Sequence, residues 1–299
     1  MVEKRTIGVD LGGTKILAGL VTSGGSVERH RETQTPLDSE ETLLAALDAA
    51  VSELLDERVA AIGFGVPSRL NRRTGIVEGS VNIPLEGLDL RARMSERFRL
   101  PVTVDNDANA ATYGEFHAGA GRDVQTMVML TLGTGCGGGV VIDGQLYRGW
   151  AEFGHTVIEY DGLPCQGSCT GRGHLEGYVS GTAATKLAQE QFGPAVDAHR
   201  LVRIAAEGDE RAVELLAEIG RRLGAGIGSL VNIFDPELVV IGGGFGAAGD
   251  FLFEPAREVV KREALAPEAD RVRIVRAELG TAAGLIGAGL LAFDAAAAE

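Results

Sequence analysis

The 299-residue sequence has few cysteines, few aromatic residues and no long uninterrupted run of apolar side chains. Three cysteines in a chain of this length do not make a disulfide framework. No stretch approaches the roughly 20 apolar residues that a membrane-spanning helix needs, and residues 1–5 carry no apolar core of a signal peptide. These absences predict a cytoplasmic protein that has no membrane partner.

Basic residues are also scarce, because 28 lysines and arginines face 42 aspartates and glutamates and leave a net charge of −14. Binding to nucleic acid needs a basic surface, so we expect no nucleic-acid partner. An acidic chain can still bind ATP, since backbone N–H groups, helix N-termini and Mg²⁺ can hold phosphates without a basic patch. The length and the hydrophobic fraction of 45% fit one large or two medium globular domains.

Glycine, by contrast, is abundant, with 43 residues, and two glycine turns recur about 120 residues apart. In each copy an apolar strand, 7–11 or 128–132, ends in a Gly/Thr turn that a second apolar run follows. Glycine lets backbone N–H groups approach an anion closely, and threonine adds a hydroxyl donor. The repeat predicts a clamp on a polyphosphate, formed by Gly12, Gly13, Thr14 and Lys15 in the first copy and by Gly133, Thr134 and Gly135 in the second.

The order of elements predicts an α/β protein in which strands come first and strand–helix alternation follows. An Asp38/Glu41 capping box precedes a helix over 43–55, and Asp143-Gly144 predicts a type I′ hairpin. We expect the boundary between the halves near 119–121. The other predicted elements are a three-stranded meander over 6–33, strands at 59–65, 101–104, 126–132, 239–241 and 272–275, helices over 108–116, 181–232 and from 281, and an irregular segment over 150–180.

Two carboxylates stand where chemistry is expected. Asp107 follows a strand and enters a helix, where ligands bind in α/β sheets, so it is the candidate general base for a hydroxyl. The alternative is that Asp105, Asn106 and Asp107 only cap the helix. By the same placement Asn106 is a candidate sugar ligand, because its amide both donates and accepts.

Asp10 lies inside an otherwise apolar strand, immediately before the first glycine turn. A buried charge needs a partner or a metal. Nucleotide-bound Mg²⁺ would supply that partner, and a hydrogen bond to a neighbouring loop is the alternative.

His155, Cys165, Cys169 and His174 fall within 20 residues, and glycines between them allow a tight loop. Structural zinc takes four such ligands in a tetrahedron, and two cysteines with two histidines are an accepted set. Paired cysteines in a cytosolic protein favour a metal over a disulfide. We therefore predict a zinc site, with a loop that binds no metal as the alternative.

These motifs resemble those of the ROK sugar kinases (repressor, open reading frame, kinase), and among them the bacterial glucokinases, over nearly the whole chain. Each short motif is weak alone, but five of them in order are specific together. The motifs are the first phosphate motif at 10–15, the catalytic-aspartate motif at 106–111, the second phosphate motif at 132–139, the Glu-x-Gly-His motif at 152–155 and the adenosine-side turn at 241–244.

The resemblance implies an actin-like ATPase (ribonuclease H-like) α/β fold, in which two α/β domains have a cleft between them. The implied domains are 1–118, on which the C-terminal helix at about 285–299 packs back, and 119–284, which carries the zinc loop. The implied activity is that of a glucokinase, which transfers the γ-phosphoryl group of ATP to the sugar 6-hydroxyl with Mg²⁺ and a structural Zn²⁺.

The resemblance also implies roles for individual residues, with Asp107 as the base. The implied sugar ligands are Asn82, Asn106, Asp107, Glu152, His155 and Glu176. The implied nucleotide ligands are Asp10, Gly12, Gly13, Thr14, Lys15, Gly133, Thr134, Gly135, Gly242, Gly243 and Gly244, and the implied metal ligands are His155, Cys165, Cys169 and His174.

The sequence departs from the family's usual metal motif, Cys-x-Cys-Gly-x-x-Gly-Cys-x-Glu. The interval from Cys165 to Cys169 is two residues longer, and His174 stands where the third cysteine usually stands. Histidine is a good zinc ligand, so we expect the metal to be kept by two cysteines and two histidines.

Other readings remain open at this point. The sugar could be fructose, mannose or an N-acetylhexosamine, and polyphosphate could replace ATP. A non-catalytic sugar-sensing regulator is the alternative from another class, although the family's repressors carry a helix-turn-helix that the nine residues before Asp10 leave no room for. We expect a homodimer or a homotetramer.

Overall fold

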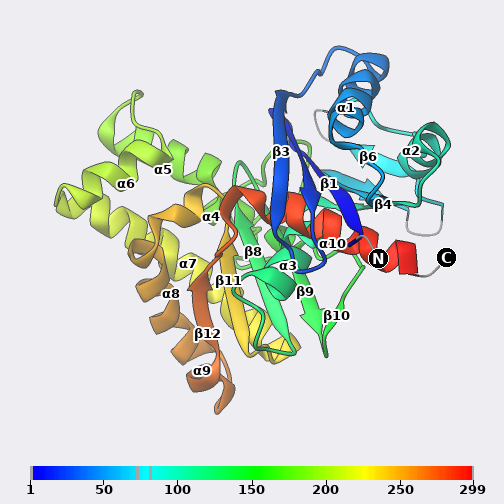
Figure 1. Ribbon diagram of the computed structural model, residues 1–299. Coiled ribbons are helices and arrows are strands. Elements are labelled where there is room, and N and C mark those ends of the chain that lie inside the picture. Colours follow the sequence, from blue (N-terminus) through cyan, green and yellow to red (C-terminus); the bar gives the residue numbers. More distant parts are fainter. Residues whose placement is uncertain (1–2, 72–73, 81–82, 298–299) are drawn as a thin grey trace. The chain divides into compact units, whose positions relative to one another are not determined.

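The computed structural model describes residues 3–71, 74–80 and 83–297, and the chain divides into two compact units (Figure 1). Unit 1 comprises Met1–Arg122 and Glu278–Glu299, and unit 2 comprises Asp123–Ala277. The chain therefore leaves unit 1 after residue 122 and returns to it at residue 278.

Unit 1 is built on a five-stranded sheet with helices on its two faces. Its elements are β1 (Arg5–Leu11), β2 (Lys15–Val21), β3 (Val27–Gln34), α1 (Glu40–Leu54), β4 (Val59–Val66), β5 (Ser68–Leu70), β6 (Val77–Ser80), α2 (Leu90–Phe98), β7 (Val102–Asn106), α3 (Asp107–Ala118), the short 3₁₀ helix η3 (Gly280–Ala282) and α10 (Ala283–Ala297). The strand order is β3-β2-β1-β4-β7. Strand β2 is antiparallel to both of its neighbours, β1 and β3, whereas β1, β4 and β7 run parallel.

Alternation along β1 decides which side chains meet which helix. Successive side chains of a strand point to opposite faces. Ile7, Val9 and Leu11 pack in one core with residues of α1 and α2. On the other face the hydroxyl of Thr6 donates to Gly289 O of α10 at 2.7 Å, and Asp10 points to the same side. Figure 1 shows α10, in red, beside β1.

Unit 2 repeats this plan with more helix. Its elements are β8 (Met127–Leu132), β9 (Cys136–Ile142), β10 (Gln145–Leu146), the 3₁₀ helix η1 (Phe153–His155), α4 (Glu176–Val179), α5 (Gly181–Phe192), α6 (Ala198–Ala206), α7 (Glu210–Phe234), β11 (Leu238–Gly242), the 3₁₀ helix η2 (Phe245–Ala248), α8 (Asp250–Glu263), α9 (Glu268–Arg271) and β12 (Arg273–Arg276). The strand order is β10-β9-β8-β11-β12, and side chains of β8 and β11 form one core with α5, α6, α7 and α8.

The two sheets have the same topology, which confirms the predicted repeat. In each, the first strand forms an antiparallel hairpin with the second and runs parallel to the fourth. The first hairpin pairs Leu11 with Ile16 and the second pairs Leu132 with Cys136, so both predicted glycine turns are hairpin loops. The type I′ turn is also confirmed, since Asp143 and Gly144 both have positive φ, at 50° and 75°.

The structure corrects the predicted start of α1. Ser39, and not Asp38, caps this helix, and its hydroxyl oxygen accepts a hydrogen bond from Thr42 N at 3.2 Å. A capping side chain reaches the N–H group three residues ahead, so a helix that begins at Glu40 selects the residue directly before it. The sequence analysis also missed the small β5–β6 hairpin, whose short strands carry no clear alternation.

Helix α10 corrects the prediction that no stretch of the chain is apolar over the length of a membrane-spanning helix. Residues Gly280–Ala297 are long and apolar enough to cross a membrane by length and composition, so the statement that no stretch approaches this limit is too strong. In the structure Leu285, Ile286 and Leu290 of this helix pack against Leu17 and Val21 of β2. A core helix of a globular unit passes the same test of composition.

Candidate active site

The first glycine turn is closed and held from the side by one threonine. Gly12 N donates to Lys15 O at 2.9 Å. Thr35, which directly follows β3, donates from its hydroxyl to Gly12 O at 2.7 Å and from its N–H to Thr14 O at 3.0 Å. Gly13 and Thr14 are exposed. The turn is therefore a fixed loop whose tip remains open to a ligand.

The side chain of Lys15, at the end of this turn, already has a partner. Its ammonium forms an ion pair with Glu32 of β3 at 2.7 Å, and both side chains are about half exposed. An exposed ion pair of this kind contributes little free energy. The ammonium group can therefore exchange Glu32 for a phosphate with little loss of free energy.

The surroundings of Asp10 disfavour the charged form of its carboxyl group. Burial first, and the charge of Asp107 second, raise the pKa of Asp10 to about 7, while Lys15 acts in the opposite direction. Helix α10 closes one side, because a Cβ atom on Gly284 would lie 2.7 Å from the Asp10 carboxylate. The carboxylate accepts no hydrogen bond from any described residue, so the alternative of a bond to a neighbouring loop is not seen. A divalent cation would relieve both causes of the shift.

Two polar side chains at the end of β7 accept hydrogen bonds from the first turn of α3. Asn106 is the N-cap of α3, and its Oδ1 accepts from Ala108 N and Asn109 N. Asp107 Oδ1 also accepts from Ala108 N, at 2.9 Å. Part of the capping alternative is thus realised, through Asn106. The Nδ2 donor of Asn106 makes no hydrogen bond within the described part of the chain, and this leaves it available to a ligand hydroxyl.

The second glycine turn is anchored to the start of α5. Gly133 O accepts from Gly181 N at 2.8 Å, and Thr134 O accepts from the Thr182 hydroxyl at 2.7 Å. Gly133 N closes the loop onto Gly135 O at 3.0 Å. The turn is therefore held through its carbonyl groups, as the first turn is held by Thr35.

The third glycine segment follows β11 and lies against β8. Gly242 pairs with Thr131, and Gly243 has φ of 81°. A Cβ atom on Gly243 would lie 2.4 Å from Leu132 O, so only glycine fits there. Since Leu132 directly precedes the second turn, the sheet brings two of the predicted nucleotide-binding segments together in unit 2.

The remaining predicted sugar ligands of unit 2 lie around η1 and α4. Glu152 directly precedes η1, His155 is its last residue, and both are exposed. Glu176 begins α4, and its Oε2 accepts from Cys136 N at 2.8 Å, which joins α4 to the end of the second turn. The predicted sugar ligand Asn82 lies outside the described residues.

The four predicted metal ligands converge. The candidate ligand atoms of His155, Cys165, Cys169 and His174 all lie within 4.8 Å of one another. The two Nδ1 atoms are 3.1 Å apart, and each Nδ1 lies 3.6 Å from one Sγ, that of Cys165 for His155 and that of Cys169 for His174. With zinc bonds of about 2.0 Å to nitrogen and about 2.3 Å to sulfur, a tetrahedron has edges of about 3.3 Å (N–N) and about 3.6 Å (N–S). The donor set fits zinc.

The surroundings of Cys165 favour its protonated thiol over the thiolate. Burial, followed by a hydrogen bond with Cys169, raises the pKa of Cys165 to about 11 in the absence of an ion. Zinc binds the thiolate form, so metal binding would release protons from this loop.

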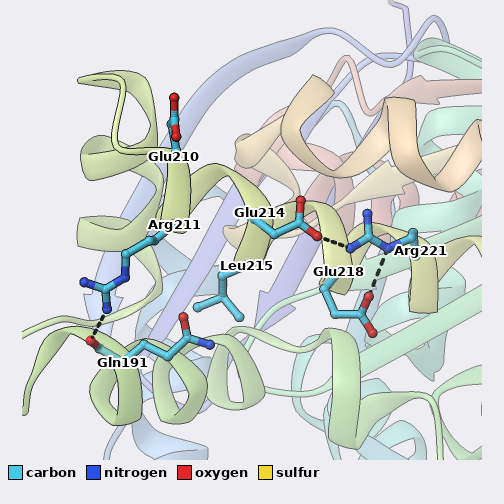
Figure 2. Close-up of a pocket in the computed structure, with 7 residues that line it drawn as sticks. All are labelled: Gln191, Glu210, Arg211, Glu214, Leu215, Glu218 and Arg221. Carbon is cyan, nitrogen blue, oxygen red and sulfur yellow. Dashed lines mark hydrogen bonds and ion pairs between the residues drawn. The ribbon is translucent and has the colours of Figure 1, made fainter.

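One surface hollow, of about 460 Å³, lies apart from these residues (Figure 2). It is lined by Gln191, Glu210, Arg211, Glu214, Leu215, Glu218 and Arg221. Figure 2 shows that its two arginines are paired, since Arg221 pairs with Glu214 and Glu218 and Arg211 donates to Gln191 O. It contains no predicted site residue and both of its arginines are already paired, so we assign it no role.

Thr35 and Thr182, which hold the turns, and Ser180, which caps α5, were not predicted from the sequence. Thr35 acts across a strand register, which no local pattern reveals. Ser180 and Thr182 act at a helix start, and a serine before a helical run was an available signal. These residues position backbone groups rather than present their own chemistry, which is why a search for reactive side chains passes over them.

The chain is similar to known proteins over nearly its whole length. The model of the ROK family matches residues 6–295. The chain is 34% identical to a glucokinase of Streptomyces coelicolor, over 96% of this chain and 97% of the relative. It is 29% identical to the xylose repressor of Caldicellulosiruptor bescii, over 94% of this chain and 76% of that protein. A crystal structure of a ROK family glucokinase from Streptomyces griseus with glucose and AMPPNP superposes with a TM-score of 0.84, at 35% identity, covering 97% of this chain and 99% of that one.

Proposed function

Because the chain belongs to the ROK family, we propose that it is an ATP-dependent hexose kinase, specifically a glucokinase. The fold is the actin-like ATPase fold of this family, with two α/β units. The observation that carries the proposal is the position of Asp107, a carboxylate at the end of β7 whose charge acts on Asp10. The glucokinases among its relatives support glucose as the sugar.

In the proposed reaction the sugar 6-hydroxyl attacks the γ-phosphorus of ATP. The Asp107 carboxylate accepts the hydroxyl proton as the new O–P bond forms, and the bond from the γ-phosphorus to the bridging oxygen of ADP breaks. General base catalysis of this kind contributes about 10²–10⁴-fold in rate. Positioning and charge neutralisation supply much of the remainder in phosphoryl transfer.

The nucleotide would be held mainly by backbone. The proposed contacts are the N–H groups of the two turns, the Thr14 and Thr134 hydroxyls, Lys15 and the Gly242–Gly244 segment. Asp10 would hold Mg²⁺ directly or through water, which fits its carboxyl group because a cation offsets both burial and the charge of Asp107. Mg²⁺ would supply neutralisation of the phosphate charge.

The sugar would be held by carboxylate and amide groups, which suit neutral hydroxyls. We assign this role to Asn82, Asn106, Glu152, His155 and Glu176 together with Asp107. If His155 binds zinc through Nδ1, as the distances within the cluster favour, its Nε2 remains able to donate to a sugar hydroxyl. A sugar that lacks one of these hydroxyls would leave a buried polar group unpaired, which is costly.

Our proposal also covers the wider setting of the enzyme. The predicted domains 1–118 and 119–284, with a C-terminal helix that packs back on the first, are supported by two compact units, the first of which includes residues 278–299. We propose a cytoplasmic homodimer or homotetramer that binds neither nucleic acid nor membrane. Fructose, mannose or an N-acetylhexosamine as the sugar, polyphosphate as the donor, and a sugar-sensing regulator remain the alternatives that the assay below separates.

The test is replacement of Asp107 by asparagine. Asparagine keeps an oxygen for Ala108 N but cannot accept a proton, so we expect the turnover number to fall by at least about 10²-fold while glucose affinity stays within a few-fold. Direct detection of sugar phosphate, with ATP or polyphosphate and a panel of hexoses, gives the readout. Asp123→Asn, an exposed site with the same charge change, is the control. Near-normal turnover of folded D107N would remove Asp107 from the proposed role.

A further inference from the structure

Gln166 lies in the interval between Cys165 and Cys169, the part of the metal loop that is two residues longer than the family's usual motif. Its side-chain amide nitrogen donates two hydrogen bonds, to Glu176 O at 3.2 Å and to the Ser180 hydroxyl oxygen at 2.6 Å. One amide in the metal loop is therefore joined to both α4 and the start of α5.

Ser180 transmits this contact to helix α5. The side chain is fully buried, and its hydroxyl oxygen also accepts from Ala183 N at 3.1 Å, which makes it the N-cap of the helix. Because the Gln166 amide and the helix N–H share this one oxygen, the metal loop fixes where the first turn of α5 begins.

The first two residues of α5 in turn orient the second glycine turn. Gly181 N and the Thr182 hydroxyl hold the carbonyl groups of Gly133 and Thr134. In a trans peptide the N–H group points opposite to the preceding carbonyl. The N–H groups of Thr134 and Gly135 are thus turned away from α5, and they donate to no other residue that the structure describes. Such adjacent free N–H groups form an anion site.

The other end of the turn is tied to the same region. Cys136 N, the next donor along the chain, is occupied by Glu176 Oε2 at 2.8 Å. Gln166 also holds the backbone carbonyl of Glu176. Both ends of the turn are therefore connected to Gln166 through short paths of hydrogen bonds inside unit 2.

We propose that Gln166 is a positioning residue for the nucleotide phosphates, which couples the metal loop to the turn at 133–135. The metal loop then serves the ATP side of the reaction as well as the sugar side. This inference rests on the proposed ATP-dependent function of the turn. It concerns a residue of the lengthened interval, where this chain departs from the usual motif.

The test measures binding of AMPPNP with Mg²⁺ by calorimetry, along with glucose binding and zinc content. In Gln166→Ala the four metal ligands are intact, so zinc stays at the wild-type level. Loss of the link raises the AMPPNP Kd about five- to tenfold, as expected for one or two hydrogen bonds, and changes the glucose Kd less. The matched control is Ser168→Ala, an exposed residue of the same interval, which leaves both constants unchanged.

Thr182→Val provides a second route, because it removes the hydroxyl that holds Thr134 O at an exposed site. It raises the AMPPNP Kd by a similar factor. In the double variant the loss is smaller than the product of the single losses, because both residues act on one turn. Hydrogen exchange of peptides covering 133–136 speeds up in both variants.

Three outcomes would overturn the proposed coupling between Gln166 and the turn. These outcomes are wild-type AMPPNP affinity in Gln166→Ala, loss of zinc in that variant, and losses that multiply in the double variant. Failure of the kinase proposal is distinct from these, because it requires wild-type protein that forms no sugar phosphate with any hexose. An active wild type whose variants bind AMPPNP normally overturns the coupling alone.

Discussion

Asp10 lies in β1 and Asp107 is the first residue of α3, directly after β7 of the same sheet, and the charge of Asp107 raises the pKa of Asp10. Asp107 must be ionised to accept a proton. Of these two carboxyl groups, Asp10 is the one that takes up a proton near pH 7 when no cation is present. At high pH both carboxyl groups are charged, and their repulsion and burial lower the stability of the folded state. A metal that accompanies the nucleotide would remove that cost when the substrate binds.

This cost gives a prediction for Asp10→Asn that depends on pH. The folded-state pKa of Asp10, about 7, lies above the ordinary value of 3.8, so the unfolded state releases this proton first. The carboxyl group therefore lowers stability progressively as pH rises from about 4 to about 7, and fully above that. Without Mg²⁺ we expect Asp10→Asn to raise the unfolding free energy at pH 8 by roughly 1–3 kcal/mol, to have little effect near pH 4, and to abolish most kinase activity.

Thermal unfolding of both proteins at pH 4, 6 and 8 measures this effect. Asp38→Asn, an exposed carboxylate in the same unit, controls for the change in net charge. A stabilisation of Asp10→Asn that is equal at all three pH values would show that the carboxyl group does not titrate as described.

At the scale of elements, the segment from η1 to α4 is the least regular part of unit 2. Between residues 156 and 175 it has isolated bridges, such as Val157 with His174, in place of strands. Polar links fasten it, since the Tyr178 hydroxyl donates to Glu159 Oε2 at 2.8 Å and accepts from Leu163 N at 2.8 Å. Since most residues of this segment are exposed or half-buried, four metal bonds would supply a large share of its order.

Metal content gives the prediction at this scale. We expect about one zinc per chain by elemental analysis, and Cys169→Ser should lose it. Cys136→Ala serves as the matched control, because Cys136 is buried in β9 and is not part of the cluster. Removal of zinc by a chelator should open residues 155–176 to protease and weaken glucose binding. Purified protein that carries no metal would contradict the zinc site.

The elements that the sequence predicts well are those with local signals. The meander, the Asp143-Gly144 turn and the helix after β7 depend on alternation, on positive φ and on residues at a helix entry, and the structure confirms each. The anchors of the turns could not be predicted, because the hydrogen bond from Thr35 to Gly12 O spans 23 residues and depends on strand register. The roles of the reactive side chains are still predictions, since they require a bound substrate.

At the scale of the whole molecule, the chain passes from unit 1 to unit 2 and back again. Unit 1 is made of two segments, so the chain leaves it near Arg122 and returns near Glu278. An ion pair of 2.9 Å joins these two residues. Glu115, fully buried in α3, accepts from Ala120 N on the leaving segment, and from Glu278 N and Leu279 N on the returning segment. One carboxylate therefore fastens both crossings.

This arrangement predicts that Glu115→Gln destabilises the protein strongly for so small a change. The amide keeps one oxygen for three N–H donors, and its NH₂ group must face one of them. Leaving buried donors unsatisfied costs about 1–3 kcal/mol each, so we expect the unfolding free energy to fall by roughly 2–4 kcal/mol. Glu96→Gln, an exposed site on α2 of the same unit, has the same charge change and should be nearly neutral. Thermal unfolding with hydrogen exchange at 119–123 and 277–280 measures both effects. Equal melting temperatures for the two variants would show that the crossings are held by other contacts.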